Sequence, residues 1–225
     1  MKKLAGIIVL MVFSLTGNAQ VENIEFGARA GLNLSHLIMK DNFERVPTTA
    51  RPNAMLGVFA RKSISEQFSG QVELLYAGIS GGIKGNEYSA PVNPRHNLHY
   101  LLLPVLTRYA INDKISLEAG PQVGYLLSAK RVQNSLGQLI PANAMNPTGG
   151  GANNPSSPTN STDISDFYKN VDVAFVLGAS YQILDPMSGF IRYQHGLTNL
   201  SILGIDGYVD RNIALSIGLT YLFKK

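Results

Sequence analysis

The stretch that decides the fold reads NIALSIGLTYLF, from Asn212 to Phe223. Every second residue is large and apolar, and the residues between them are mostly small or polar. Because alternate side chains of a β-strand point to opposite faces, this stretch predicts a strand with one apolar face and one face of small or polar residues. A soluble sandwich would turn the apolar face inward, whereas a membrane barrel would turn it toward lipid. The rest of the chain distinguishes these two arrangements.

The start of the chain predicts export. Lys2 and Lys3 precede an apolar run from Leu4 to Leu15, and small residues follow up to Ala19. This pattern is typical of a secretory signal peptide cleaved after Ala19, so we expect residues 1–19 to be removed and residues 20–225 to form one barrel domain. The apolar run is shorter than the roughly 20 residues that span a bilayer. No later stretch resembles a transmembrane helix, so membrane insertion would require strands.

Composition excludes several classes of protein. The chain has no cysteine, which excludes disulfides, thiolate metal sites and cysteine nucleophiles. Charged residues make up 15% of the chain, whereas about 25% is usual in soluble domains. Removing Lys2 and Lys3 lowers the net charge from +4 to +2. So balanced a charge does not indicate a nucleic-acid partner.

Seven more segments alternate in the same way as the last one, and together they predict eight strands. These seven cover residues 25–35, 51–62, 68–80, 97–109, 115–127, 170–182 and 189–196. Pro104 falls in the inward set of its strand and predicts a local bulge or bend, because proline cannot donate to the ladder.

The connections between these strands alternate in length. Short polar turns are expected at 63–67, 111–114 and 185–188, and long connections at 37–50, 81–96, 130–169 and 197–210. The Asn-, Ser-, Pro- and Gly-rich part, residues 133–163, cannot bury enough apolar surface to fold alone, so we expect a disordered external loop. Barrels of the outer membrane have short periplasmic turns and long outer loops. The sequence therefore predicts an all-β fold, an eight-stranded antiparallel up-and-down transmembrane β-barrel.

Aromatic residues lie near both ends of the predicted strands, as interface belts do. Those expected at the periplasmic ends are Phe26, Phe68, Tyr109, Tyr181, Tyr221 and Phe223, and those nearer the outer ends are Tyr76, Tyr125 and Tyr193.

Six charged residues are predicted to face the lumen: Arg29, Arg61, Glu73, Glu118, Asp172 and Arg192. An eight-stranded barrel has an interior that side chains just fill, so we expect these charges to pair with one another. One interpretation is a structural charge network. The other is a gated narrow pore whose ion pairs exchange partners, and the narrow interior favours the first.

The histidines raise the hypothesis of an enzyme acting on envelope lipid, with His99 and either Ser80 or Ser128 at the outer rim. No spacing signature supports it, and we interpret His36, His96, His99 and His195 as rim residues at the membrane interface. Asp163 and Asp166 lack the residue order of a calcium loop. We therefore assign no catalytic residue, metal site or cofactor.

The chain resembles the PorT-like outer-membrane β-barrel family of the Bacteroidetes. The resemblance lies in GARAGLNLS at 27–35, LLLPVL at 101–106, RYQHGLTNL at 192–200 and YLF at 221–223. It implies an eight-stranded barrel in a Gram-negative outer membrane, and the member that names the family is linked to protein secretion. The family often has an acidic residue at the position of Leu102, so a less polar lumen is expected there. The closing strand with Tyr221 and Phe223 looks like the signal that the barrel-assembly machinery recognises.

These observations predict a structural or interaction role, or an accessory subunit, at the cell envelope. The barrel would contact membrane lipid directly, and its external loops would contact an envelope protein partner. The alternative is a narrow porin-like channel for ions or small solutes, and a lipid-modifying enzyme is a distant third.

Overall fold

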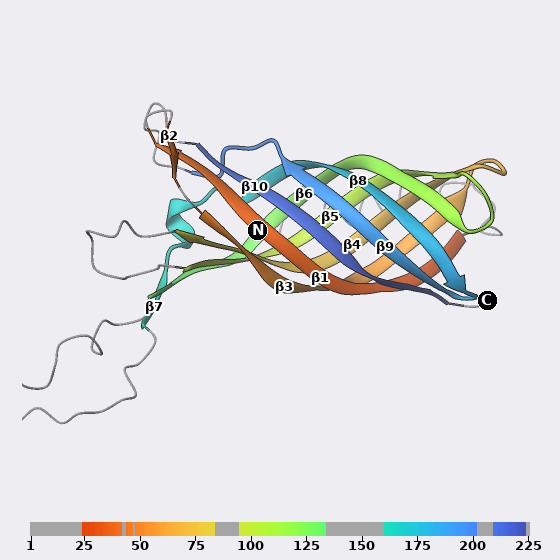
Figure 1. Cartoon of the computed structure of the whole chain (residues 1–225), viewed down its shortest axis with the longest axis horizontal. Helices are drawn as coiled ribbons and strands as arrows, with labels where there is room; N and C mark the ends of the chain where they lie inside the picture. The colour runs from red at the N-terminus through yellow and green to blue at the C-terminus, as the bar shows by residue number, and fades with distance from the viewer. Residues whose placement is uncertain are drawn as a thin grey trace, which may run out of the picture.

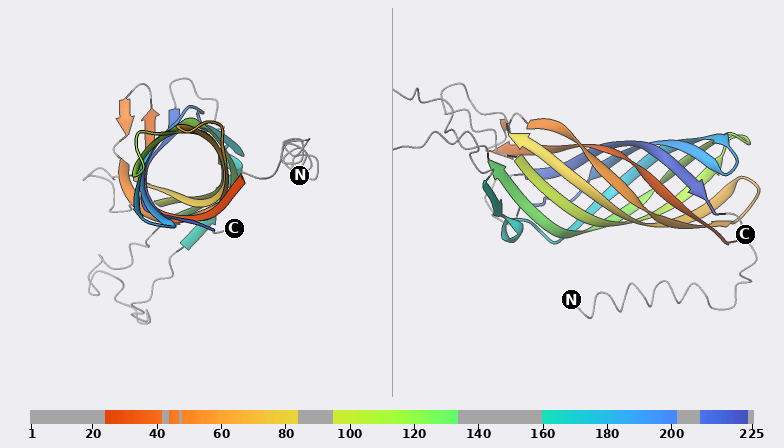
Figure 2. Two further views of the ribbon diagram at one scale, coloured as in Figure 1. Left: turned by 90° about the vertical axis from the view of Figure 1, so that its right-hand side faces the viewer. Right: turned by 90° about the horizontal axis from the view of Figure 1, so that it is seen from below.

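The computed structural model describes residues 24–41, 44–46, 48–83, 95–133, 160–201 and 209–223. Eight long antiparallel strands form a closed barrel (Figure 1, Figure 2). They are β1 (Ile24–Asp41), β3 (Thr48–Ser63), β4 (Phe68–Ile83), β5 (Arg95–Ala110), β6 (Ile115–Gln133), β8 (Val171–Leu184), β9 (Met187–Gly196) and β10 (Val209–Leu222). Each strand pairs with the next in this order, and β10 pairs with β1 to close the sheet. The predicted fold class is confirmed.

Three short elements extend the wall at one end of the barrel. β2 (Glu44–Val46) pairs with the end of β1, and β7 (Asn160–Asp163) pairs with the end of β6. The 3-10 helix η2 (Ser165–Phe167) follows β7. The prediction of one loop over 130–169 is therefore wrong at its two ends, because residues 130–133 and 160–163 pair as strands. Residues 134–159 and the predicted signal peptide lie outside the described residues.

Three short turns join strands at the opposite end, which we call the short-turn end. They span residues 64–67, 111–114 and 185–186, close to the predicted positions. In the first turn the Ile64 amide donates to the Phe68 carbonyl, at 2.8 Å. In the second, the Asn112 side chain accepts the Ile115 amide, at 2.8 Å. The other end, which carries the long connections, we call the long-loop end. No helix in the described ranges is long and apolar enough to cross a membrane.

The outer face of the barrel is apolar. Along β10 the residues predicted to face lipid are exposed, with Ile217 at 61%, while their neighbour Ser216 is 5% exposed. The same alternation holds on β1, where Leu32 is 58% exposed and Arg29 only 1%. A soluble sandwich would bury these aliphatic side chains. An apolar exterior around a closed sheet is the arrangement of a transmembrane barrel.

Pro104 does not produce the predicted bulge. On the β4 side, Val72 opposite Val105 and Leu75 opposite Leu102 belong to a single register. On the β6 side, the one register shift lies between His99 and Tyr100. The missing amide of Pro104 removes a ladder hydrogen bond but requires no extra residue, so the register is preserved.

The barrel interior has two layers of different character. Toward the short-turn end it is lined by charged and amide side chains. Toward the long-loop end, β4 and β5 contribute mainly apolar side chains, whereas β1, β8 and β10 contribute polar ones such as Asn33, Asp172 and Asn212. The buried apolar layer includes Met55, Leu75, Ala77, Ile79, Leu98, Tyr100, Leu102 and Leu126. The sequence predicts a filled polar interior, and the half nearer the long loops differs from this prediction only on the side formed by β4 and β5. There the inward positions of β4 and β5 carry aliphatic residues, including Leu102.

An arginine at the middle of the lipid face should destabilise the barrel more than one near its edge. We expect Ile217→Arg to lower the free energy of unfolding by about 2–4 kcal/mol, and Ile183→Arg near the short-turn end by about 0–1 kcal/mol. Denaturant titration in lipid vesicles measures both variants. Equal costs at the two positions would contradict a membrane-spanning exterior.

Candidate functional site

Four strands bring four charged residues to one level of the lumen. Arg29 comes from β1, Glu73 from β4, Glu118 from β6 and Arg192 from β9, and all four are buried. Glu118 and Arg192 both lie opposite Gly178 of the intervening strand β8. A Cβ at Gly178 would lie 2.9 Å from both Arg192 Cγ and Glu118 Oε1. The glycine thus leaves the space that the two charged side chains fill.

The two arginines bridge the two carboxylates, and we call these four residues the lumen charge cluster. Arg192 Nη1 and Nη2 each donate to Glu73 at 2.7 Å, and its Nε donates to Glu118 at 2.6 Å. Arg29 donates to both oxygens of Glu118, at 3.3 and 3.4 Å, and its Nη1 lies 3.3 Å from Glu73. Bidentate pairs of this kind satisfy the planar guanidinium groups and offset the cost of burying charge.

Neighbouring side chains hold the cluster in place. The Arg29 guanidinium lies 4.3 Å from the centre of the Phe190 ring, a cation–π contact. Its Nε donates to the Thr220 hydroxyl, at 3.2 Å. The amide of Gln71 donates to Glu73. The cluster is therefore a connected network within the described part of the lumen.

Two further arginines lie in this polar half of the lumen. Arg61 donates to Gln71 at 2.9 Å and pairs at 3.5 Å with Glu25, whose side chain is 43% exposed. Arg108 is buried, and its Nη1 has no hydrogen-bond partner among the described residues. Arg108 was not singled out from the sequence, although the alternation over 97–109 places it in the inward set. The cluster and its surroundings thus contain more arginines than carboxylates.

Asp172 does not join the lumen charge cluster, contrary to the expectation of mutual pairing. It lies on β8 opposite Gly124, next to Tyr100, and forms no ion pair among the described residues. Gly178, at the level of the cluster, is six residues farther along β8, a distance of about 20 Å at the rise of a strand. The strand register thus separates Asp172 from the arginines.

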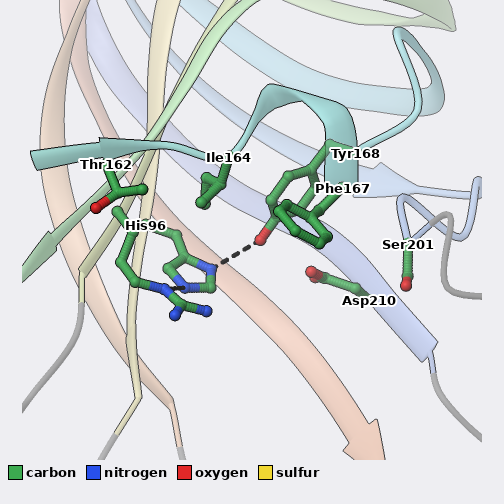
Figure 3. A pocket seen from close by; sticks show the side chains of 8 residues that line it. His96, Thr162, Ile164, Phe167, Tyr168, Ser201 and Asp210 are labelled. Carbon is green, nitrogen blue, oxygen red and sulfur yellow. Dashed lines mark hydrogen bonds between the residues drawn. The ribbon is translucent and has the colours of Figure 1, made fainter.

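A cavity of about 410 Å³ opens at the long-loop end (Figure 3). We call it the mouth pocket. Its lining comes from four strands, β5, β6, β7 and β10, and from the segments around η2 and after β9. The lining residues are His96, Arg131, Thr162, Ile164, Phe167, Tyr168, Ser201 and Asp210. Of these, only His96 was named as a rim residue from the sequence. The alternation of β10, in which Asn212 and Ala214 face inward, predicts that Asp210 also faces inward.

Backbone contacts fix the walls of the mouth pocket. The amide of Ile164 donates to the Ala129 carbonyl at 2.9 Å, which ties the start of η2 to β6. Asp163 accepts a hydrogen bond from the Ser165 amide at 2.8 Å. Hydrogen bonds from the backbone and the side chain of Ser165 lower the pKa of the Asp163 carboxyl. Tyr168 forms a β-bridge with Ser201.

The hypothesis of a catalytic His99 with Ser80 or Ser128 gains no support from the hydrogen bonds, although Ser128 lies opposite His99 in the register of β5 and β6. The His99 ring contacts the Tyr76 hydroxyl at 2.8 Å on the outer face, whereas the Ser80 hydroxyl lies inside the barrel, 2.9 Å from Asn53 Oδ1 and 3.0 Å from Asn97 Oδ1. His195 contacts the Tyr193 hydroxyl at 3.1 Å in the same manner as His99. Within the described ranges, no group of three or more histidine and acidic side chains is arranged to hold a metal ion.

The closed sheet, its apolar exterior and its filled interior define a membrane-spanning β-barrel. The chain belongs to the outer membrane protein beta-barrel domain family, whose model matches residues 18–201. Membership of this family places the barrel in the outer membrane.

The solved structures that match this chain share little sequence with it. Neisserial surface protein A is 8% identical, with a TM-score of 0.50 over 88% of this chain and 97% of its own. Ail of Yersinia pestis, in complex with the heparin analogue sucrose octasulfate, is 11% identical, with a TM-score of 0.44 over 88% and 99%. OprG from Pseudomonas aeruginosa is 10% identical, with a TM-score of 0.42 over 89% and 96%. A comparison with curated proteins finds no match.

Neutralising one member of the lumen charge cluster should destabilise the barrel strongly. Glu118→Gln leaves Arg29 and Arg192 buried with half of their anionic partners, so we expect a loss of about 3–5 kcal/mol. Glu25→Gln removes the half-exposed partner of Arg61 and should cost at most about 1 kcal/mol. Denaturant unfolding of both variants measures the difference, and similar losses would argue against a structural role for the cluster.

Proposed function

We propose that this protein is a non-conducting outer-membrane barrel that acts as a structural or accessory subunit of the cell envelope. The observation that carries the proposal is the filled lumen. The lumen charge cluster spans the interior at one level, and the apolar layer lies between it and the long-loop end. Leu75, Leu98 and Tyr100 in that layer are no more than 1% exposed. These side chains, together with buried polar ones at the same end such as Asn33 and Asn212, leave a hydrated ion little room in an eight-stranded interior.

A barrel whose interior is filled can bind partners only at its exposed surfaces. The walls extend past the apolar exterior at the long-loop end, through β2, β7 and η2. External surfaces supported by a rigid scaffold are where binding residues concentrate. We therefore propose an envelope protein as the partner at this end, and the barrel-assembly machinery as the partner during biogenesis through the strand that carries Tyr221 and Phe223.

A narrow channel is the alternative, and the polar half of the lumen is the observation in its favour. Arg108 adds positive charge that the two cluster carboxylates do not balance, and Arg61 is paired only with the half-exposed Glu25. An open path through this half would favour anions. The apolar layer opposes conduction, so opening would require these side chains to move.

The finer relationship to PorT-like barrels is also part of this proposal. It rests on the motifs quoted above, including GARAGLNLS on β1 and RYQHGLTNL, which begins on β9. Cleavage after Ala19 accompanies it, since an outer-membrane protein has to be exported. A secretion role does not follow from fold likeness alone.

Single-channel recording distinguishes a sealed barrel from a channel. We expect the purified protein in planar bilayers to give no discrete conductance steps, because the apolar layer excludes hydrated ions. A general porin inserted from the same detergent serves as the positive control. Reproducible, anion-selective steps would overturn the sealed-barrel proposal in favour of the channel.

Affinity purification tests the accessory role. We expect protein tagged near Gly150 and extracted from native outer membranes in mild detergent to retain a stoichiometric partner. A barrel without the tag, carried through the same purification, controls for adhesion to the resin. Recovery of the tagged barrel alone would contradict the accessory-subunit proposal.

A further inference from the structure

The mouth pocket contains a buried carboxylate that lacks a positive partner. Asp210, at the start of β10, is 1% exposed. Its Oδ1 has no hydrogen-bond partner among the described residues, and no ion pair to it is found there. In Figure 3 its carboxyl group points toward the Tyr168 hydroxyl, in the middle of the lining residues. A buried carboxylate without a compensating positive charge is costly, so this site favours a ligand that supplies one.

A second carboxylate adds to the negative charge beneath the pocket. Asp172 is 2% exposed, its Oδ1 also has no partner in the described structure, and it repels Asp210 electrostatically. The Tyr100 hydroxyl interacts electrostatically with both carboxyl groups and is likewise unpartnered there. Asp172 and the Tyr100 hydroxyl therefore interact with Asp210 from outside the pocket lining, to which Asp210 itself belongs.

A chain of hydrogen bonds runs across the pocket from Arg131 to Asp210. Arg131 Nε donates to His96 Nε2 at 3.4 Å, so His96 carries its proton on Nδ1. That Nδ1 lies 2.7 Å from the Tyr168 oxygen and donates to it, and the Tyr168 hydroxyl then donates to Asp210. Every donor in the chain points toward Asp210. The chain positions the carboxylate and leaves Oδ1 for another donor.

We propose that the mouth pocket binds a small ligand carrying a protonated primary amine, with its ammonium group at Asp210. The volume of about 410 Å³ lies in the range of small-molecule sites. Ile164 and the Phe167 ring, which is 55% exposed, offer apolar contact to the body of the ligand. Arg131 at the exposed rim complements a carboxylate. A free amino acid or short peptide has both charges, with the amine as the essential group.

Three matched dipeptides test the proposal on the unmodified protein. Dialanine carries both charges, N-acetyl-dialanine lacks the ammonium, and dialanine amide lacks the carboxylate. Calorimetry in detergent should detect saturable binding of dialanine. N-acetyl-dialanine should bind about tenfold or more weakly than dialanine. Dialanine amide should lose less affinity, because the Arg131 that pairs with the carboxylate is exposed to water. Equal binding of the acetylated probe, or no saturable binding of dialanine, would overturn the proposal.

Two aspartate variants locate the ammonium. Asp210→Asn keeps the shape of the side chain and an acceptor for Tyr168 but removes the charge, and should weaken dialanine binding by about tenfold or more. Asp166→Asn, on the exposed side of η2 and outside the pocket lining, is the matched control and should bind as the parent does. Equal affinities of the two variants would overturn the assignment to Asp210. These outcomes are independent of conductance, which tests the filled lumen.

Discussion

The structure depends on one constraint, that lipid offers no hydrogen-bond partners to a peptide backbone. A sheet in a membrane must therefore close on itself, since an open edge would leave amide and carbonyl groups unsatisfied. Here β10 pairs with β1 without interruption, from Leu222 opposite Gly27 to Val209 opposite Lys40. Closure with eight strands leaves an interior only wide enough for side chains. The arrangement of the lumen follows from that narrowness.

Charged side chains in so narrow a space need partners within it. The lumen charge cluster meets this need by having each arginine contact both carboxylates, and Gly178 provides the room. Nearer the long-loop end the inward positions of β4 and β5 are mainly apolar, so apolar side-chain packing fills that side of the interior. Two different physical solutions, ion pairing and apolar contact, fill successive levels of the same barrel.

The mouth pocket differs from both layers because its walls do not come from the barrel strands alone. η2 and the segment after β9 pack against the outer ends of β5, β6 and β10, and they are tied there by backbone hydrogen bonds. The Lys169 amide, for example, donates to the Leu200 carbonyl at 2.8 Å. Asp210 and Tyr168 come together only because these segments converge. Binding chemistry at this end is therefore separate from the filled lumen below it.

The alternation of side chains determined most of the fold from the sequence alone. The period of two along segments such as 212–223 identified the strands, their lipid-facing side and the inward positions of Arg29, Glu73, Glu118 and Arg192, because a strand leaves no other choice of face. It did not determine how strands align with one another. Register decided that Asp172 lies about 20 Å along β8 from the level of the arginines, at the rise of a strand. It also decided that Arg108 lies near them.

Contacts between distant segments were beyond the reach of the local pattern. The pairing of residues 130–133 with 160–163 depends on two short polar stretches on either side of a long connection, and neither stretch alternates. His96 was assigned to the rim, but its contact with Tyr168 joins residues 72 positions apart. The sequence by itself determined a barrel, since alternation is a local property of the chain. Only the tertiary structure decided which inward side chains contact one another and what forms the mouth pocket, because those contacts depend on register and on the packing of segments far apart in the sequence.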